Sequence, residues 1–259
     1  MTSSIKEIWN YRDMIWSLVR RELRGKYEKS ILGFLWAFLG PLFQILIYSV
    51  VFTVVFHNNM PNYAMFLMAG MLPWTFFNDS VAQGTSVIIN NAEMVKKIYF
   101  PREVLVISEV TAKLVNMLLS FIVMALFLLA TRVGFSIQLV ILPVAIIIEY
   151  LFILGLSLIV SSLTVYLRDL EYVINVVLMA WIWGTPVMYT ADGITNNLYK
   201  TLLLCNPMTA IINNYQSILY YHRWPTIEGL LIPFIESIVI LIIGAVIFVK
   251  GKKRFAEEM

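Results

Sequence analysis

The stretch IQLVILPVAIIIEYLFILGLSLIVSSLTVYL, residues 137–167, is apolar along its whole length and carries one charged residue, Glu149. An α-helix needs about 20 mostly apolar residues to cross the hydrocarbon core of a bilayer. A shorter stretch, Tyr172–Tyr189, carries no charge. Four more stretches are long enough to cross: Ile31–Phe56, Tyr63–Ile89, Val104–Thr131 and Ile227–Val249. The sequence therefore predicts an all-α integral membrane protein with six transmembrane helices.

The composition excludes a soluble chain. Hydrophobic residues make up 60% of the 259 residues and charged residues only 14%, against about 25% charged in globular proteins. Most of the apolar surface must therefore face lipid, which excludes a soluble enzyme, a disordered tail and a disulfide-stapled secreted module. The net charge of +3 is too small to indicate nucleic acid, and the single cysteine, Cys205, forms no internal disulfide.

The distribution of basic residues orients the spans, because Lys and Arg favour cytoplasmic loops. Six spans put both termini and the loops after the second and fourth spans on one side, which then holds nearly all basic residues. The opposite side keeps Arg132, Lys200 and Arg223. We therefore expect a multi-pass protein with both termini in the cytoplasm.

Residues 192–223 pose an ambiguity, because Leu198–Tyr221 is long enough to cross the membrane. Asn206-Pro207 interrupts it, however, and a seventh span would place the Lys250–Arg254 cluster outside. We expect residues 192–223 to form an outer re-entrant pair of short helices between the fifth and sixth spans. The whole chain, 1–259, then forms one membrane domain.

The N-terminal segment, residues 1–29, has a different pattern. Its apolar residues recur at helical spacing, while Lys6, Asp13, Arg20 and Arg24 lie on the opposite face. A basic amphipathic helix with tryptophans on its apolar face is typical of a helix lying in the membrane interface. The alternative is an ordinary soluble helix. The apolar positions are Ile5, Ile8, Trp9, Trp16, Val19, Leu23 and Tyr27.

The sequence holds no recognisable reaction centre. Neither histidine has a second ligand at helical spacing, so we expect no metal site, and no phosphate-binding loop occurs. Glu109 lies one turn from Lys113, which predicts an interfacial ion pair. Glu149 and Glu236 lie deeper, where a carboxyl serves either as a proton or cation relay or as a hydrogen-bonded group between packed helices.

Aromatic residues, 14% of the chain, gather in clusters beside prolines. Their flat faces match the apolar faces of sugar rings, which favours a glycan pathway. Anchoring in the membrane interface is the alternative for any single ring. The candidate pathway residues are Trp36, Trp74, Phe77, Trp181, Trp183 and Tyr189.

Six motifs in order resemble the permease subunit of ABC transporters that export lipid-linked polysaccharides such as O-antigen, capsule and teichoic acid. The resemblance covers nearly the whole chain. Its motifs are Arg21–Tyr27 with Ser30–Trp36 and Pro41, Gly70–Phe77, Asn90–Arg102, Tyr166–Asp169, Pro186–Tyr189 and Asn206–Met208.

The resemblance implies a homodimeric permease of the bacterial cytoplasmic (inner) membrane, with the pathway between two copies. It implies an ABC ATPase subunit as partner, which binds ATP-Mg, so that no cofactor is held by this chain. Segments 90–102 and 167–171 would couple to that ATPase. Without the resemblance, their basic residues indicate only that the two segments are cytoplasmic loops. The implied coupling residues are Lys96, Lys97, Tyr99, Phe100, Pro101, Arg102, Arg168 and Asp169.

The resemblance further implies two partners, namely membrane lipid and a cargo that is a polyprenyl-diphosphate-linked glycan. Its pyrophosphate would meet basic residues of the N-terminal helix: Arg20, Arg21, Arg24 and Lys26. Two alternatives remain. A permease of the same fold could flip lipids or export drugs, and a secondary transporter could use Glu149 or Glu236 without an ATPase, although the chain lacks the internal repeat common in such folds.

Overall fold

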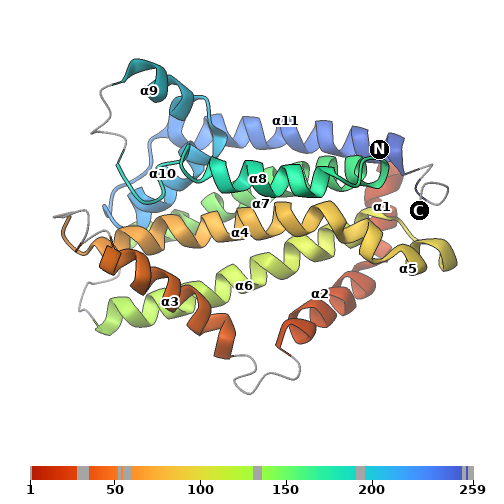
Figure 1. Ribbon diagram of the computed structural model, residues 1–259, viewed down its shortest axis with the longest axis horizontal. Helices are drawn as coiled ribbons and strands as arrows, with labels where there is room; N and C mark the ends of the chain where they lie inside the picture. Colours follow the sequence, from red (N-terminus) through yellow and green to blue (C-terminus); the bar gives the residue numbers. More distant parts are fainter. Residues whose placement is uncertain are drawn as a thin grey trace.

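The computed structural model describes residues 2–27, 35–51, 54, 60–130, 136–190, 196–252 and 255 (Figure 1). Within these ranges the regular secondary structure is helical and no strand occurs. The long helices run side by side along the long axis of the molecule (Figure 1). The predicted all-α class is confirmed.

The helices follow one another in an order that matches the predicted spans. Their bounds are α1 Thr2–Asn10, α2 Arg12–Tyr27, α3 Trp36–Val50, α4 Tyr63–Asn90, α5 Ala92–Lys97, α6 Glu103–Ala130, the 3-10 helix η3 Ile137–Ile141, α7 Leu142–Tyr166, α8 Leu170–Trp181, α9 Asn197–Leu204, α10 Pro207–Leu219 and α11 Ile227–Gly251.

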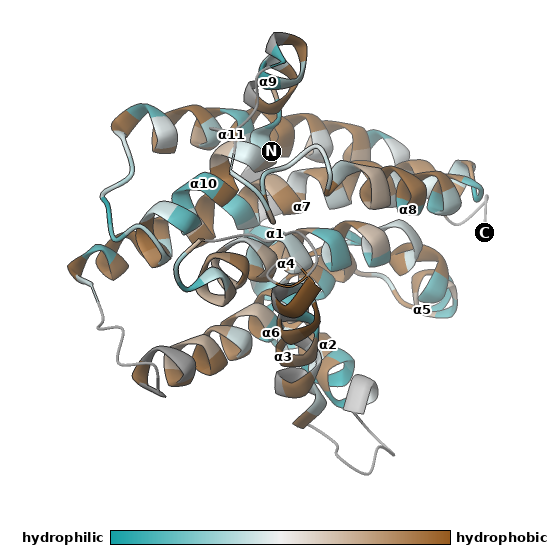
Figure 2. Cartoon of the chain, turned by 60° about the vertical axis from the view of Figure 1, so that its left-hand side comes forward, coloured by the Kyte–Doolittle hydropathy of each residue, from teal (hydrophilic) through white to brown (hydrophobic). Residues whose placement is uncertain are grey.

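Three helical segments in the described part of the chain are long and apolar enough to cross a membrane: Glu103–Leu126, Ile137–Tyr166 and Ile227–Gly251. The protein is therefore a multi-pass membrane protein. Helices α3, α4 and α8 occupy the other three predicted spans, and the count of six stays a prediction. Figure 2 shows that hydrophobic residues dominate α3 and α8, whereas hydrophilic residues are frequent in α2 and α5.

Helix α4 is the centre of the bundle. It packs against α3, α6, α7, α8 and α10, and most of its side chains are buried. Because protein rather than lipid surrounds it, α4 tolerates polar residues such as Ser80 and Thr85, both fully buried. Burial inside the bundle therefore accounts for the polar residues of α4, which make it less apolar than α7 although its 28 residues are long enough to span.

The N-terminal segment forms two helices instead of the single one expected. The chain turns at Tyr11, whose hydroxyl donates to the carbonyl of Tyr99 at 3.5 Å. Helix α2 then packs on α6 and buries Val19. Trp9 and Trp16 remain exposed, as lipid-facing interface residues would be.

The end of the bundle that carries α9 and α10 contains the break predicted at Asn206-Pro207. Pro207 starts α10 at a helix position where the missing N–H has no consequence, so α9 and α10 are separate short helices. Helix α8 ends at Trp181, earlier than the predicted stretch. Residues 182–190 are non-helical. Pro186 lacks an N–H and disfavours helical geometry at Thr185, so α8 does not continue through it.

Candidate functional site

The two predicted coupling segments lie at one end of the bundle, beside the C-terminal end of α11 (Figure 1). Arg102 donates to the carbonyl of Lys252, and the hydroxyl of Tyr166 donates to the carbonyl of Gly251 at 2.8 Å. Lys252 in turn forms an ion pair with Glu103 at the start of α6. Segments far apart in the sequence are thus fixed around the same helix end.

In the first segment, the six-residue helix α5 is followed by an extended turn. Phe100 and Pro101 are buried and anchor the turn, whereas Tyr99 is 87% exposed. Lys97 forms an exposed ion pair with Glu93 at 3.1 Å, and Lys96 is also exposed. The segment therefore offers an aromatic ring and basic side chains at its surface.

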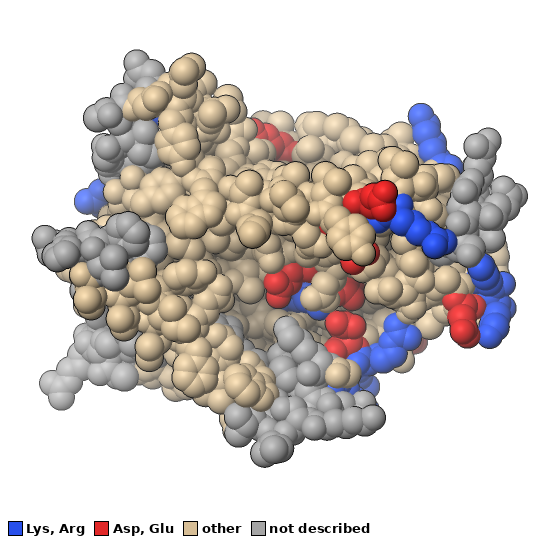
Figure 3. Space-filling view, in the orientation of Figure 1, with Lys and Arg blue, Asp and Glu red and all other residues tan. Residues whose placement is uncertain are grey.

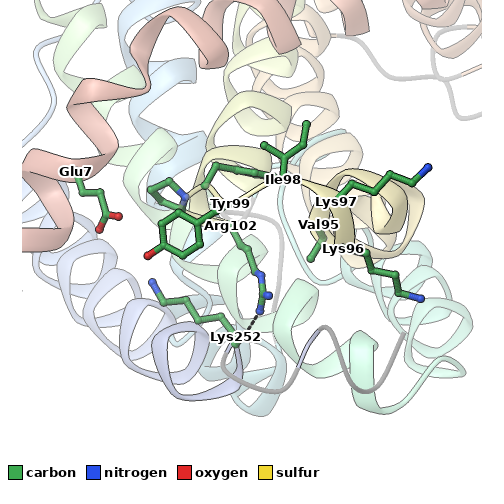
Figure 4. A pocket seen from close by; sticks show the side chains of 10 residues that line it. Glu7, Val95, Lys96, Lys97, Ile98, Tyr99, Arg102 and Lys252 are labelled. Carbon is green, nitrogen blue, oxygen red and sulfur yellow. Dashed lines mark hydrogen bonds between the residues drawn. The ribbon is translucent and has the colours of Figure 1, made fainter.

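A cavity of about 580 Å³ lies between this segment and α1 (Figure 4). Glu7 faces it from α1 and Lys252 from the end of α11, with residues 95–102 between them. Four of its lining side chains are basic and one is acidic. Its basic residues are Lys96, Lys97, Arg102 and Lys252.

The second segment is the short turn between α7 and α8. Arg168 and Asp169 are both exposed, and the backbone N–H of Leu170 donates to the carbonyl of Leu167, which closes the turn. Figure 3 shows most charged residues of this face over α2, α5 and the start of α8. Both segments therefore contribute to one charged end.

A second hollow, of about 720 Å³, lies along α2. Arg20, Arg21 and Arg24 line it together with Trp16, and Asp13 and Ser17 complete the lining. The side chain of Lys26 lies outside the described residues. Three of the four basic residues predicted to meet a headgroup thus share one groove, here called the basic groove.

One ion pair, between Lys113 of α6 and Glu22 of α2, holds the basic groove against the bundle, and a second pair within α6 positions Lys113. Lys113 of α6 lies 2.9 Å from Glu109 and 3.1 Å from Glu22 of α2. The predicted Glu109–Lys113 pair is confirmed. No local sequence pattern signals the role of Glu22, because its partner Lys113 is 91 residues away.

The candidate pathway aromatics divide into two groups. Trp74 and Phe77 are buried within the protomer. The ring of Phe77 lies 5.2 Å from that of Trp181. By contrast, Trp36 is 45% exposed and Trp183 62% exposed.

Tyr189 lies beside Tyr199 of α9 and takes part in a hydrogen-bond cluster. Its hydroxyl lies 2.9 Å from the Tyr199 hydroxyl, and both hydroxyls donate to the carbonyl of Trp183. Tyr199 was not singled out from the sequence, because its role depends on the fold of the outer helices.

Glu149 is fully buried in α7 and accepts a hydrogen bond from the Tyr215 hydroxyl of α10 at 2.5 Å. The expectation of a carboxyl hydrogen-bonded between packed helices is confirmed for this residue. Glu236 on α11 is half-buried. Tyr215 is a further residue that sequence analysis missed.

The fold and these surfaces define a helical membrane protein with one charged end, a basic groove and a cluster of aromatic residues at the opposite end. The profile of the ABC-2 type transporter family matches residues 14–220, and the chain belongs to that family. It is a membrane permease component, and in this family the ATPase is a separate subunit.

Two known relatives are similar over all or nearly all of the chain. It is 36% identical to the O-antigen export system permease protein RfbA of Myxococcus xanthus over 100% of both chains. It is 30% identical to the O-antigen export system permease protein RfbA of Klebsiella pneumoniae, over 95% of this chain and 94% of the Klebsiella protein. The polysialic acid transport protein KpsM of Escherichia coli matches 24% of the chain at 36% identity.

Proposed function

We propose that the chain is the membrane-spanning subunit of an ATP-driven exporter that moves a polyprenyl-diphosphate-linked polysaccharide across the bacterial cytoplasmic membrane. The convergence of both inner segments on the end of α11 is the observation that carries this proposal. A partner that contacts this end meets both segments at once, so a single movement of the partner displaces both. Full-length similarity to O-antigen export permeases supports the class of cargo.

The ATPase subunit is the partner for the charged end. Exposed Tyr99, Lys96 and Arg168 are the contact residues, while buried Phe100 keeps the first segment rigid. Rigidity matters because a coupling segment has to transmit movement without bending. ATP-Mg binds to that partner, since the chain has no phosphate-binding loop.

The basic groove is the site for the pyrophosphate of the cargo. Arginine is suited to phosphate because its planar guanidinium donates two parallel hydrogen bonds. Trp16, exposed beside Arg20, sits where an aromatic ring is favoured at the level of the lipid headgroups. A membrane-embedded lipid diphosphate can therefore reach the groove without leaving the bilayer.

Two copies of the chain enclose the pathway. Helices α3 and α8 lie on either side of α4 and expose apolar side chains that include Phe43, Leu46, Val176 and Met179. Trp36 and Trp183 lie at the ends of these two exposed faces. A second copy packed against them would line the space between the copies with aromatic rings, on which sugars slide without a fixed register.

The proposed topology is six spans with both termini cytoplasmic and residues 192–223 outside. Cys205 is exposed on the outer helices and serves as a natural label for an impermeant thiol reagent added from outside. In a Cys205→Ser background, a cysteine at position 252 should stay unlabelled. Labelling of position 252 from outside would contradict the topology.

The function is tested by reconstituting the permease with its ATPase subunit in vesicles and measuring ATP hydrolysis and glycan transfer. Lys96→Glu combined with Arg168→Glu should weaken assembly or uncouple hydrolysis from transfer. Lys200→Glu, an exposed change on outer helix α9, is the matched control and should have no effect. Transfer without any ATPase would indicate a secondary transporter, and transfer of phospholipid or drug without glycan would indicate a different cargo.

A further inference from the structure

Asn206 uses every hydrogen-bonding position of its side-chain amide. Its Oδ1 accepts from the Trp181 indole Nε1–H at 3.0 Å and from the Met208 backbone N–H at 3.0 Å. Its Nδ2 donates to the Gly184 carbonyl and to the Thr185 hydroxyl, both at 2.8 Å. An amide has two acceptor sites and two donor hydrogens, so one side chain joins the end of α8, residues 184–185 and the start of α10.

The segment that Asn206 holds has no regular secondary structure of its own. Residues 182–190 follow α8, and side chains from elsewhere satisfy several of their carbonyls. Gln216 donates to the Pro186 carbonyl at 2.9 Å, and the Tyr63 hydroxyl donates to the Met188 carbonyl at 2.7 Å. In an apolar environment each unsatisfied carbonyl costs free energy, so these side chains determine the shape of the segment.

Helix α10 is itself pinned to the bundle by two neighbours of Gln216. The Tyr215 hydroxyl donates to Glu149 of α7, and Asn214 donates to the Gly229 carbonyl of α11 at 2.7 Å. Pro233 explains the second bond: it has no N–H, so the Gly229 carbonyl four residues earlier lacks its usual helical donor. The segment is therefore tied through α10 to two membrane helices.

We propose that Asn206 is the positioning residue of the outer end of the pathway, an inference that rests on the proposed export function. Asn206 locks segment 182–190, which carries Trp183 and Tyr189, to the α9–α10 hairpin. The hairpin and the aromatic segment consequently move as one body. The Tyr189 and Tyr199 hydroxyls both donate to the Trp183 carbonyl, so at rest this body keeps Trp183, Tyr189 and Tyr199 together and closes the outer end to water and small solutes.

The test compares two substitutions at Asn206. Asn206→Asp keeps both acceptor positions, so it preserves the cap of α10, at which Asp and Asn are equivalent, and the bond from Trp181. It removes the donors and places a carboxylate against the Gly184 carbonyl. Asn206→Ala removes all four bonds. Asn213→Asp is the control, because Asn213 is exposed on the same helix.

The measurement is the leak of a small labelled solute from vesicles that hold the assembled permease–ATPase complex without ATP, followed by glycan transfer per ATP hydrolysed. Asn206→Asp should raise the leak roughly tenfold and lower transfer per ATP, since two hydrogen bonds are lost and a repulsion is added. Assembly should remain close to that of the parent, and thermal stability should fall less than in Asn206→Ala, which loses all four bonds. Asn213→Asp should match the parent in every measurement.

Trp183→Ala separates this inference from the export function on which it rests. If Trp183→Ala alters glycan transfer while Asn206→Asp leaves leak and transfer per ATP unchanged, the positioning role is wrong and the pathway stands. If Trp183→Ala has no effect on transfer, the pathway assignment itself is wrong. A leak caused only by Asn206→Ala, together with lowered stability, would reduce Asn206 to a structural cap and overturn the proposal.

Discussion

Arg21 donates through Nη2 to Oδ1 of Asn91 at 2.8 Å. Arg21 lines the basic groove on α2, and Asn91 is the residue immediately before helix α5. A second hydrogen bond, from Asn91 Nδ2 to the Val87 carbonyl, fixes the amide on the end of α4. The proposed headgroup site and the proposed coupling segment are therefore in direct contact.

This contact predicts that a bound anion competes with Asn91 for Arg21. Asn91→Ala removes the contact and leaves the charge of the basic groove unchanged. Binding of a polyprenyl diphosphate should be retained, whereas its effect on the ATPase rate of the complex should fall. Asn91→Asp should hold Arg21 more firmly, because charged hydrogen bonds are stronger, and should shift the response to higher lipid concentrations.

Binding of the polyprenyl diphosphate and the ATPase rate are both measured on the complex in vesicles. Vesicles of phosphatidylglycerol provide a second measurement, which separates the effect of a diphosphate from that of an ordinary anionic lipid. An ATPase response of Asn91→Ala that equals the parent's would show that the contact carries no signal. Loss of binding in Arg20→Ala is a separate result that tests the groove alone.

Lys113 should be essential for stability. It is only 2% exposed and lies between Glu109 and Glu22. Lys113→Met leaves Glu109, itself 11% exposed, without its cation, and breaking such a buried pair costs about 3–5 kcal/mol. Thermal unfolding in detergent measures the loss, and Glu109→Gln in the same chain should recover part of it.

Lys97→Met is the matched control for Lys113→Met, because both side chains of the Lys97–Glu93 pair are exposed. Exposed pairs contribute about 0–1 kcal/mol, so its unfolding temperature should be close to the parent's. Equal losses for the two methionine variants would contradict the assignment.

The crossing of α7 and α11 should tolerate no side chain at Gly155. A Cβ there would lie 2.6 Å from the backbone nitrogen of Leu241, and backbone cannot move aside as a side chain does. Gly155→Ala should therefore separate the helices and destabilise the fold by about 1–3 kcal/mol. Gly25→Ala, with no atom within 4 Å of its added carbon, should instead be neutral or slightly stabilising. Unfolding midpoints of the two variants decide the point.

The two groups of aromatic residues should respond differently to alanine. Trp74→Ala and Phe77→Ala empty buried positions and should lower stability by about 3–5 kcal/mol. Trp36→Ala combined with Trp183→Ala removes exposed rings and should slow glycan transfer without affecting folding, because ring stacking contributes about 1–3 kcal/mol per contact.

Transfer rates normalised to assembled complex separate these outcomes. Unchanged normalised rates for the Trp36/Trp183 double variant would show that these rings only anchor the protein in the interface.

The sequence alone determined the features that depend on neighbours along the chain. Apolar runs such as 137–167 and 227–249 specify helices through composition. Pro207 specifies the break between the outer helices. The spacing of Glu109 and Lys113 specifies a pair on one helix face. Each of these follows from local backbone and side-chain chemistry.

Tertiary structure decided the features that depend on which helices meet. Helix α4 is central although α7 is more apolar, because hydropathy does not distinguish a helix surrounded by lipid from one surrounded by protein. Burial of Trp74 follows from that central position. Three of the four partners of Asn206 lie 21–25 residues away, and the partner of Arg21 lies 70 residues away. Hydrogen bonds over such separations leave no periodic trace in the sequence, so only packing could bring these groups together.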